Sequence, residues 1–305
     1  MRTYSSNQGR ATERTARSQM MTLRGFTLVE LLVVIFTLAV LAVMVLPALA
    51  ATTGREKATS CLNNLRQLQI AYHLYAGDYN DLMVTNQKSS DSLNNWAAGI
   101  MNGPLGVGGS ITDPTNILLL EESLLYPYCR NVGIYKCPAD TGPNPQLAEE
   151  EETIEDPCRS YSVNTYMNGY DVGATHQDDW PTGTYIVQTK LSMITSPGPA
   201  KRIVFADESQ DSIDDGNLSV VPSAIGTAYT PVDVWWNWPT ARHGNGAGFS
   251  YADGHATDIS WLGTQLQTWE AANVTGSQPY TTLSGNDLAD LRTVQAGIAL
   301  PNGQN

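Results

Sequence analysis

The sequence has few basic side chains for its length. It holds 17 Lys and Arg against 30 Asp and Glu, so its formal net charge at pH 7 is −13. Proteins that bind nucleic acid use Lys and Arg to neutralise phosphate groups. The deficit therefore argues against a nucleic-acid partner, whereas it is compatible with a divalent cation.

Cysteine and histidine are also scarce, with four of each in 305 residues. None of the cysteines forms a Cys-x-x-Cys pair, the close spacing that marks the common structural zinc sites. From spacing alone, the sequence therefore argues against a zinc site.

Polar residues are almost missing from one long stretch near the amino terminus. Between Leu31 and Ala51 only Thr37 is polar, and residues 26–50 as a helix would span about 37 Å, enough for a bilayer core. The first 25 residues carry a net charge of +4, which leaves −17 for the other 280. Basic residues before the span and acidic ones after it predict a cytoplasmic leader and an exported bulk.

One carboxylate, that of Glu30, lies inside this apolar stretch. A charge in a membrane helix is unfavourable unless it finds a partner, so Glu30 is a functional candidate. Two simpler readings are a plain signal anchor and a secretory signal peptide cut after Ala48-Leu49-Ala50. Neither explains a glutamate placed next to Gly25-Phe26.

The run from Arg24 to Leu32, RGFTLVELL, resembles the class III signal of type IV prepilins and type II secretion pseudopilins. The resemblance implies that a prepilin peptidase cuts between Gly25 and Phe26 and methylates the new amino-terminal Phe26. Glycine lets a protease approach the backbone closely. The resulting α-amino cation could pair with Glu30 of a neighbouring subunit and fix the stagger between subunits. Pro47 matches a proline found late in the apolar helix of the family.

A helical pattern continues beyond the apolar run, with one face formed by Ala58, Cys61, Leu65, Leu68, Tyr72, Tyr75 and Tyr79. This periodicity predicts a single helix from Phe26 to near Tyr79. The segment from Cys61 to Leu68, CLNNLRQL, resembles the helix that follows the membrane span in a large bacterial subgroup of pseudopilin-like proteins.

A second signature lies near the carboxy terminus, where His243 is followed by nine residues and then Asp253-Gly254. This H-X9-DG pattern is identified with the same subgroup. Asp-Gly is a tight-turn signal, and we expect structural roles for His243, Asp253 and Gly254, such as a hydrogen bond across a hairpin. A catalytic alternative would pair His243 with Asp253 and use Ser250 as nucleophile, but no nucleophile elbow or oxyanion loop accompanies them.

Two further sets of residues are candidates, one for a calcium site and the other for disulfides. Asp207, Asp211, Asp214 and Asp215 form an acidic cluster, and family members often bind calcium in carboxy-terminal loops, but the spacing does not fit an EF-hand. Calcium is thus a weak candidate, and no other cofactor is expected. Disulfides persist in exported compartments. The expected pairs are Cys137 with Cys158 or Cys129 with Cys137, while Cys61 would stay reduced.

These observations predict an α+β, pilin-like fold. A long amino-terminal helix, transmembrane in its first half, packs on a carboxy-terminal antiparallel β-sheet head with long loops. Strands are expected at Ser160–Met167, Thr184–Leu191, Lys201–Ala206, Ala247–Tyr251 and His255–Ile259, and a short helix at Asn116–Tyr128. The domains are a cleaved leader (1–25), a transmembrane and assembly helix (26–50), its exported continuation (51–80) and a globular periplasmic or extracellular head (81–305).

The expected function is structural and not enzymatic. The resemblance implies a prepilin-like subunit of a bacterial inner membrane, with a single pass, a cytoplasmic amino terminus and a periplasmic carboxy-terminal domain. It would assemble into the pseudopilus or pilus-like filament of a type II secretion or related system. Its partners would be the prepilin peptidase, other pseudopilin subunits and the inner-membrane assembly platform. The alternative is a membrane-anchored exported binding protein or hydrolase that shares only the export signal.

Overall fold

The structure is a computed structural model, which describes residues 27–86, 94–101, 114–141, 157–169, 187–220, 233–272 and 282–298. It divides into two compact units, Met1–Leu49 and Ala50–Asn305. The proposed processing residues Gly25 and Phe26 lie outside the described residues. Pro47 lies within 42–53, a stretch of helix whose side chains are not described.

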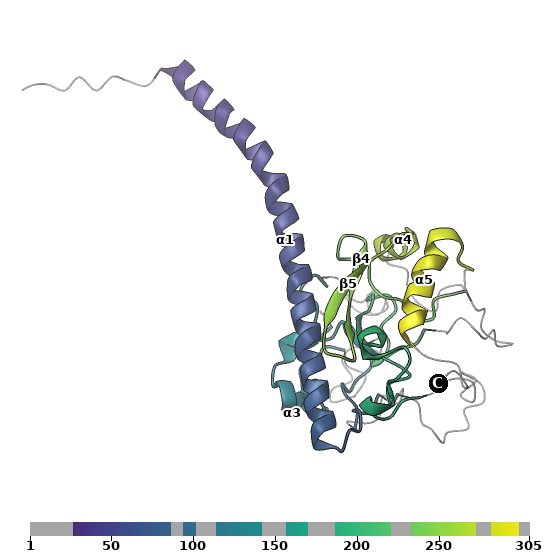
Figure 1. The fold of residues 1–305 in the computed structure, drawn as a ribbon. Coiled ribbons are helices and arrows are strands. Elements are labelled where there is room, and N and C mark those ends of the chain that lie inside the picture. The colour runs from purple at the N-terminus through teal and green to yellow at the C-terminus, as the bar shows by residue number, and fades with distance from the viewer. Residues whose placement is uncertain are drawn as a thin grey trace, which may run out of the picture. The chain divides into compact units, whose positions relative to one another are not determined.

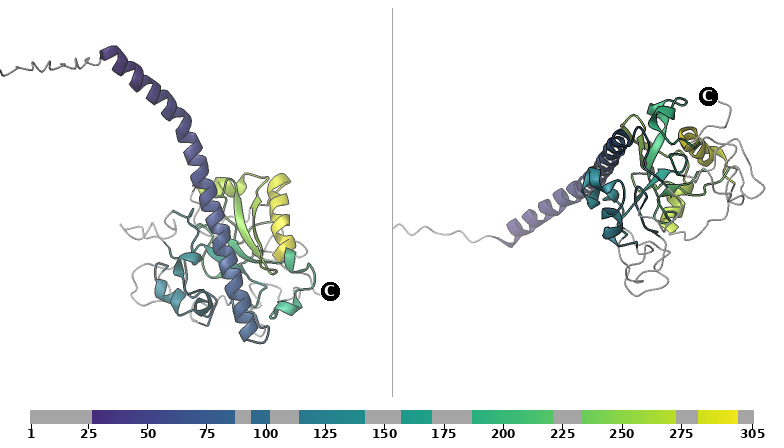
Figure 2. Two further views of the ribbon diagram at one scale, coloured as in Figure 1. Left: turned by 60° about the vertical axis from the view of Figure 1, so that its left-hand side comes forward. Right: turned by 90° about the horizontal axis from the view of Figure 1, so that it is seen from below.

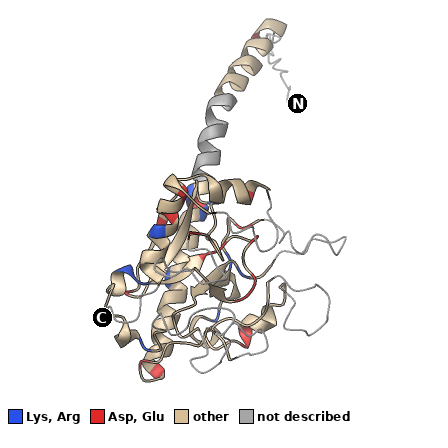
Figure 3. Cartoon of the chain, turned by 90° about the vertical axis from the view of Figure 1, so that its right-hand side faces the viewer, with Lys and Arg blue, Asp and Glu red and all other residues tan. Residues whose placement is uncertain are grey.

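The first helix, α1 (Leu28–Asp78), belongs to both units. In the first unit, its large apolar side chains between Leu28 and Leu41 are between 42% and 78% exposed. Charged residues are nearly absent from these turns, whereas both signs occur along the second unit (Figure 3). Within the described residues, no helix is long and apolar enough to cross a membrane.

The second unit contains a five-stranded sheet with the order β3-β1-β2-β4-β5. Its strands are β1 (Tyr161–Asn164), β2 (Ile203–Asp207), β3 (Asn217–Leu218), β4 (Gly246–Tyr251) and β5 (Ala256–Ser260). Three neighbouring pairs are antiparallel, and β1 and β3 run parallel.

The predicted fold class was therefore wrong in two respects. The sheet is mixed and not antiparallel, because the two-residue strand β3 pairs in parallel with β1. The amino-terminal helix α1 is also not a spine of the head along its whole length, because only its part after Leu49 belongs to the same unit as the sheet. Its described apolar part covers only residues 28–41, and this part belongs to a different unit from the sheet.

Two hydrophobic cores lie on opposite faces of the sheet. The first joins the inner face of α1 to β1 and β2, and its α1 members are Cys61, Leu65, Leu68, Ala71, Tyr72 and Tyr75. The second joins the other face to α4 (Gln265–Ala272) and α5 (Gly285–Ile298). Figures 1 and 2 show the same order of layers, with the sheet between α1 and α5. The predicted α1 face is thus confirmed at its centre, whereas Tyr79 is half exposed.

The hairpin of β4 and β5 brings the carboxy-terminal signature against α1. Gly248 faces the helix, where an added Cβ would lie 2.9 Å from Leu65 Cδ1 and 3.3 Å from Cys61 Sγ. Two residues on, the Ser250 hydroxyl donates to Gln69 Oε1 at 2.9 Å. The helix can approach the strand this closely because position 248 has no side chain.

The remaining secondary-structure predictions were correct only in part. The tight turn at Asp253-Gly254 is confirmed, with Gly254 at a φ of +101°. The predicted helix at 116–128 is two short helices, α2 (Ile117–Glu121) and α3 (Tyr126–Cys129). The described part of the predicted strand 184–191 makes only isolated bridges at Gln188 and Lys190.

Packing of α1 on the sheet gives a direct stability prediction. Leu68 is fully buried in the first core, whereas Leu74 on the same helix is 51% exposed. We expect Leu68→Ala to lower the free energy of unfolding by about 2–5 kcal/mol, because it removes buried methyl groups and leaves a cavity. Urea unfolding of the full chain in detergent, followed by tryptophan fluorescence, measures the change.

Leu74→Ala is the matched control, because it makes the same chemical change on the same helix. We expect it to change stability by no more than about 0.5 kcal/mol. Equal losses for the two variants would contradict the packing of α1 described above.

Candidate metal centre

Four side chains with metal-binding atoms meet beside α1. Cys61 comes from α1, Asp207 from the end of β2, His243 from the turn before β4, and Cys137 from the loop after the short helix η1 (Val132–Tyr135). Their ligand atoms all lie within 4.8 Å of one another, and within the described ranges no other set of three or more His, Cys, Asp or Glu does so. We call these four residues the thiol-histidine-aspartate cluster.

The contacts inside the thiol-histidine-aspartate cluster are short. His243 Nε2 lies 2.9 Å from Asp207 Oδ2 and 3.3 Å from Cys137 Sγ. Cys61 Sγ lies 3.4 Å from the same Asp207 oxygen. Cys61 and His243 therefore converge on one carboxylate oxygen, and Cys137 joins them through the imidazole.

A local irregularity in β2 directs Asp207 toward α1. The pairing of β2 with β4 shifts register between Ile203 and Ala206. Within the shifted stretch, Phe205 meets Tyr72 of α1 edge to face, and beyond it Asp207 meets Cys61. Bulges often redirect a side chain next to a functional site.

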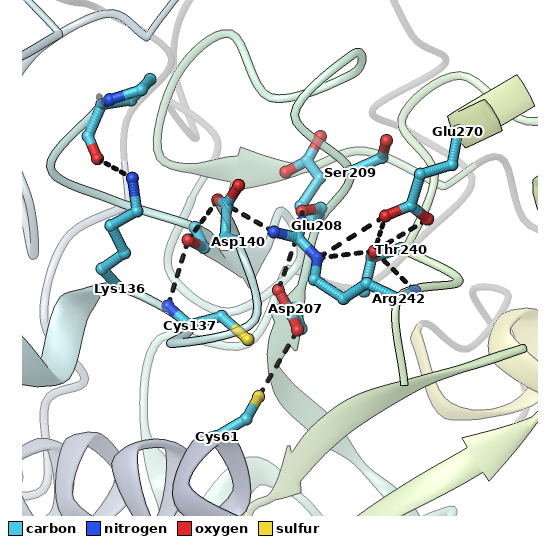
Figure 4. Close-up of polar contacts among 12 residues, drawn as sticks. Cys61, Lys136, Cys137, Asp140, Asp207, Glu208, Ser209, Thr240, Arg242 and Glu270 are labelled. Atoms are coloured by element: carbon cyan, nitrogen blue, oxygen red, sulfur yellow. Dashed lines mark hydrogen bonds and ion pairs between the residues drawn. The ribbon is translucent and has the colours of Figure 1, made fainter. Parts of the chain in front are cut away.

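Arg242 is not one of the four cluster residues but contacts the carboxylate of Asp207. Its guanidinium is 2.9 Å from Asp140 Oδ2 and 3.5 Å from Asp207 Oδ1, and Nε donates to Thr240 Oγ1 at 2.7 Å. Glu270 lies at the outer edge of the group, 3.8 Å from Nε. Figure 4 shows Arg242 between Asp140 and Glu270, with Cys137 to the left of Asp207 and Cys61 below it.

A hydrogen-bond chain fixes the loop that carries Cys137. The backbone N–H of Cys137 donates to Ser160 Oγ at 3.1 Å, and the Ser160 hydroxyl donates to Asp140 Oδ2 at 2.5 Å. Asn64 of α1 donates to the carbonyl of Lys136 at 2.9 Å. The loop is therefore held both by the Arg242 ion network and by the helix that supplies Cys61.

The pKa values of the cluster residues are shifted in different directions by burial and by their neighbours. Burial would raise the pKa of Asp207, but Arg242 and then His243 outweigh it and hold that pKa below its usual value. Burial would lower the pKa of His243, but the hydrogen bonds with Asp207 and Cys137 raise it to about 10. The hydrogen bond with Cys137, together with burial, raises the pKa of Cys61.

The pKa values of Cys137 and Arg242 are also set by burial on one side and by neighbouring groups on the other. Burial would raise the pKa of Cys137, but its contacts with Cys61 and His243 leave it below the usual value. Burial would lower the pKa of Arg242, but Asp207 and Asp140 keep it well above the usual value. The site thus holds carboxylate, cationic and thiol groups in one water-poor volume.

The burial of these side chains argues against a catalytic role for the signature residues His243 and Ser250. The His243 side chain is 1% exposed, and Asp207 and Ser250 are fully buried. Ser250 also lies in hydrogen bonds with Gln69 and the backbone N–H of Phe205, not with His243. A nucleophile needs a base within reach and a substrate that can approach it, and these residues offer neither.

The structure separates the other predicted residues. Asp253 does not pair with His243 across the hairpin: it accepts from the backbone N–H of His255 at 3.2 Å and contacts that ring at 2.5 Å, in the exposed turn. None of the four cysteines, all of which lie within the described residues, forms a disulfide, so neither predicted pair of Cys137, with Cys129 or with Cys158, is present. Of the weak calcium candidates Asp207, Asp211, Asp214 and Asp215, the first lies in the thiol-histidine-aspartate cluster.

The remaining three calcium candidates are spread along the chain after β2. Asp211 is fully buried, and Asp215 accepts from the backbone N–H of Asn217 at 2.7 Å. Burial and the neighbouring Asp214 raise the pKa of Asp215 to about 7. Within the described residues, they do not meet as one group of metal-binding oxygens.

Sequence reasoning missed the cluster because it looked for closely spaced cysteines. The contacting pairs are 146, 106 and 36 residues apart in the chain. One signal was present in the sequence: Cys61 is the first residue of the CLNNLRQL segment, and His243 is the first residue of the H-X9-DG signature. Their meeting in space could not be read from their spacing.

The chain was also compared with known proteins. No family model matches it, and searches of curated proteins and of solved structures found no similar protein. The chemistry of the site is therefore inferred from its own side chains.

Proposed function

We propose that this chain is a prepilin-like structural subunit. It is cut between Gly25 and Phe26 by a prepilin peptidase, held in a bacterial inner membrane by its apolar helix, and assembled with other such subunits into a pseudopilus or pilus-like filament. It acts as a building element and not as an enzyme, and its head faces the periplasm or the exterior.

The observation that carries this proposal is the apolar surface of the first part of α1. Its large side chains between Leu28 and Leu41 are exposed, and Glu30 is the one charged residue among them. An exposed apolar surface of this kind marks a site for lipid or for other proteins. The Glu30 carboxylate accepts from the Thr27 backbone N–H at 2.9 Å and from its hydroxyl at 2.8 Å, and so lies at the amino-terminal turn.

The second support is that the part of α1 that carries the CLNNLRQL segment packs on the hairpin that carries the H-X9-DG signature. Besides the Gly248 contact, Arg66 donates to the carbonyl of Ala256 at 3.0 Å, and His73 Nε2 lies 2.9 Å from the carbonyl of Ala252. Residues 179 and 190 positions apart in the sequence are therefore in direct contact. This favours a single role for both motifs over a chance match at either end.

Substitution of Glu30 tests the proposal. We expect Glu30→Ala to be cut at Gly25/Phe26 as in the wild type, but to enter filaments about tenfold less or worse, because the new α-amino cation of a neighbour loses its partner. Amino-terminal sequencing and intact mass measure processing and the added methyl group. Sheared filament fractions, or cross-linking in membranes, measure assembly.

Glu56→Ala is the matched control, since it removes an exposed carboxylate from the same helix. It should be cut and assembled normally. A wild-type chain that begins at Ala51, or a Glu30→Ala chain that assembles like the control, would show that the helix is only an export signal or anchor, as in an anchored binding protein or hydrolase.

A further inference from the structure

We propose that Cys61, Cys137, Asp207 and His243 bind one Zn²⁺ ion. The site goes beyond the filament function and does not depend on it, because all four ligands lie within the second unit. Its role is structural, joining α1, the Cys137 loop, β2 and the turn before β4.

The donor set selects the metal class. Two thiolates, one imidazole and one carboxylate suit Zn²⁺, which takes four such ligands in tetrahedral sites. Calcium and magnesium prefer oxygen ligands only. Copper(II) and nickel(II) favour square-planar arrangements of nitrogen and oxygen. Of these ions, zinc fits the mixed sulfur, nitrogen and oxygen donors best.

The spacing of the ligand atoms also fits. With zinc–sulfur bonds of about 2.3 Å and zinc–nitrogen or zinc–oxygen bonds of about 2.0–2.2 Å, the edges of a tetrahedron measure about 3.3–3.8 Å. The observed separations are 3.4 Å for Cys61 Sγ to Asp207 Oδ2 and 3.3 Å for Cys137 Sγ to His243 Nε2. The 2.9 Å between His243 and Asp207 requires only a small opening on binding.

Charge balance explains the place of Arg242. Two thiolates and one carboxylate around Zn²⁺, with a neutral imidazole, leave a net charge of −1 in a buried site. The Arg242 guanidinium, 3.5 Å from the second oxygen of Asp207, offsets part of this negative charge, although it also pairs with Asp140 at 2.9 Å. Such a partner also orients the ligating carboxylate, as outer-shell groups do in metal sites.

The site is closed, which points to structure and not to catalysis. Four protein ligands complete the tetrahedron, whereas catalytic zinc keeps one position for water or substrate. The side chains are buried, as described above. On binding, protonated thiols and a protonated His243 release their protons to solvent, so the step needs no oxidant or reductant.

The first test measures metal on the full chain, purified in detergent without chelator. We expect elemental analysis by inductively coupled plasma mass spectrometry to find about one zinc ion per chain. We expect Co²⁺ added to the chelator-treated protein to give thiolate-to-cobalt charge-transfer absorption and the strong visible bands of a tetrahedral site. Both readouts use the wild-type chain, so they do not depend on whether a variant folds.

Variants then assign the ligands. Cys137→Ser should lower the zinc content at least about tenfold. Cys129→Ser, which changes a free cysteine outside the cluster, should keep both the zinc and the cobalt spectrum. Asp207→Asn should weaken zinc retention against a competing chelator while keeping the cobalt–thiolate band.

Two results would overturn the proposal. One is a folded wild-type chain that neither contains zinc nor takes up Co²⁺ while all four thiols react. The other is an intact mass two hydrogens lower, with a peptide map joining Cys61 to Cys137, which would make the pair a disulfide of the exported protein.

Discussion

Arg242→Met is expected to lower the free energy of unfolding by about 3–5 kcal/mol, because it removes the cation from a buried ion network and leaves its carboxylates without compensation. The Arg242 side chain is 7% exposed, that of Asp140 5%, and that of Asp207 fully buried. Methionine has a similar length and is apolar, so the change keeps much of the packing and removes the charge. Urea unfolding of the full chain in detergent measures the loss.

Arg292→Met is the matched control. Arg292 also pairs with a carboxylate, that of Asp233, but both side chains are about one-third exposed. Solvent-exposed ion pairs contribute about 0–1 kcal/mol, so this variant should unfold near the wild-type midpoint. If Arg242→Met and Arg292→Met lost the same small amount, the buried network would not hold the thiol-histidine-aspartate cluster in place.

Local patterns predicted the parts of the fold that depend on local chain geometry. The inner face of α1, from Cys61 to Tyr75, follows from helical periodicity, because each buried position lies three or four residues from the next. The hairpin of β4 and β5 follows from Asp253-Gly254, because that dipeptide favours the tight turn between two adjacent strands.

The parts that the sequence did not predict depend on long-range packing. The strand β3 contains only two residues, too short to show an alternating pattern, so its parallel pairing with β1 left no signal. The predicted helix at 116–128 is interrupted after Glu121, where the chain bonds to a distant segment: the Ser123 hydroxyl accepts from the Ala98 N–H, and the Leu124 N–H donates to the Asn95 carbonyl. These contacts involve residues that sequence periodicity cannot bring together.

The candidate metal centre illustrates the same limit. Its ligands lie on a helix, a loop, a strand and a turn, and they meet only where α1 packs on the sheet. The signature histidine was expected to act within its own hairpin, because a local partner, Asp253, was in view. In the structure, His243 instead pairs with Asp207, which is farther away in the sequence than Asp253. The signature histidine therefore belongs to a cluster that joins four segments of the chain.

Trp96 is the other position at which we expect a large loss of stability. It is fully buried, donates from Nε1 to the Gly216 carbonyl at 2.9 Å, and meets Phe205 edge to face with ring centroids 5.2 Å apart. The buried guanidinium of Arg159 lies 5.4 Å from its ring. Trp96→Ala should lower the free energy of unfolding by about 3–5 kcal/mol through the cavity it leaves.

Trp96→Phe separates packing from the hydrogen bond. It keeps an aromatic ring against Phe205 and Arg159 but removes the N–H. The Gly216 carbonyl still accepts from the Val163 N–H at 2.9 Å, so we expect the lost hydrogen bond to cost only about 0.5–1.5 kcal/mol. Because Trp96 also stacks on Tyr135, two residues before Cys137, the alanine variant should in addition loosen the Cys137 loop. Faster thiol modification of Cys137 in Trp96→Ala than in Trp96→Phe would show this link. Equal rates in both variants would mean that the Trp96 ring does not position the loop.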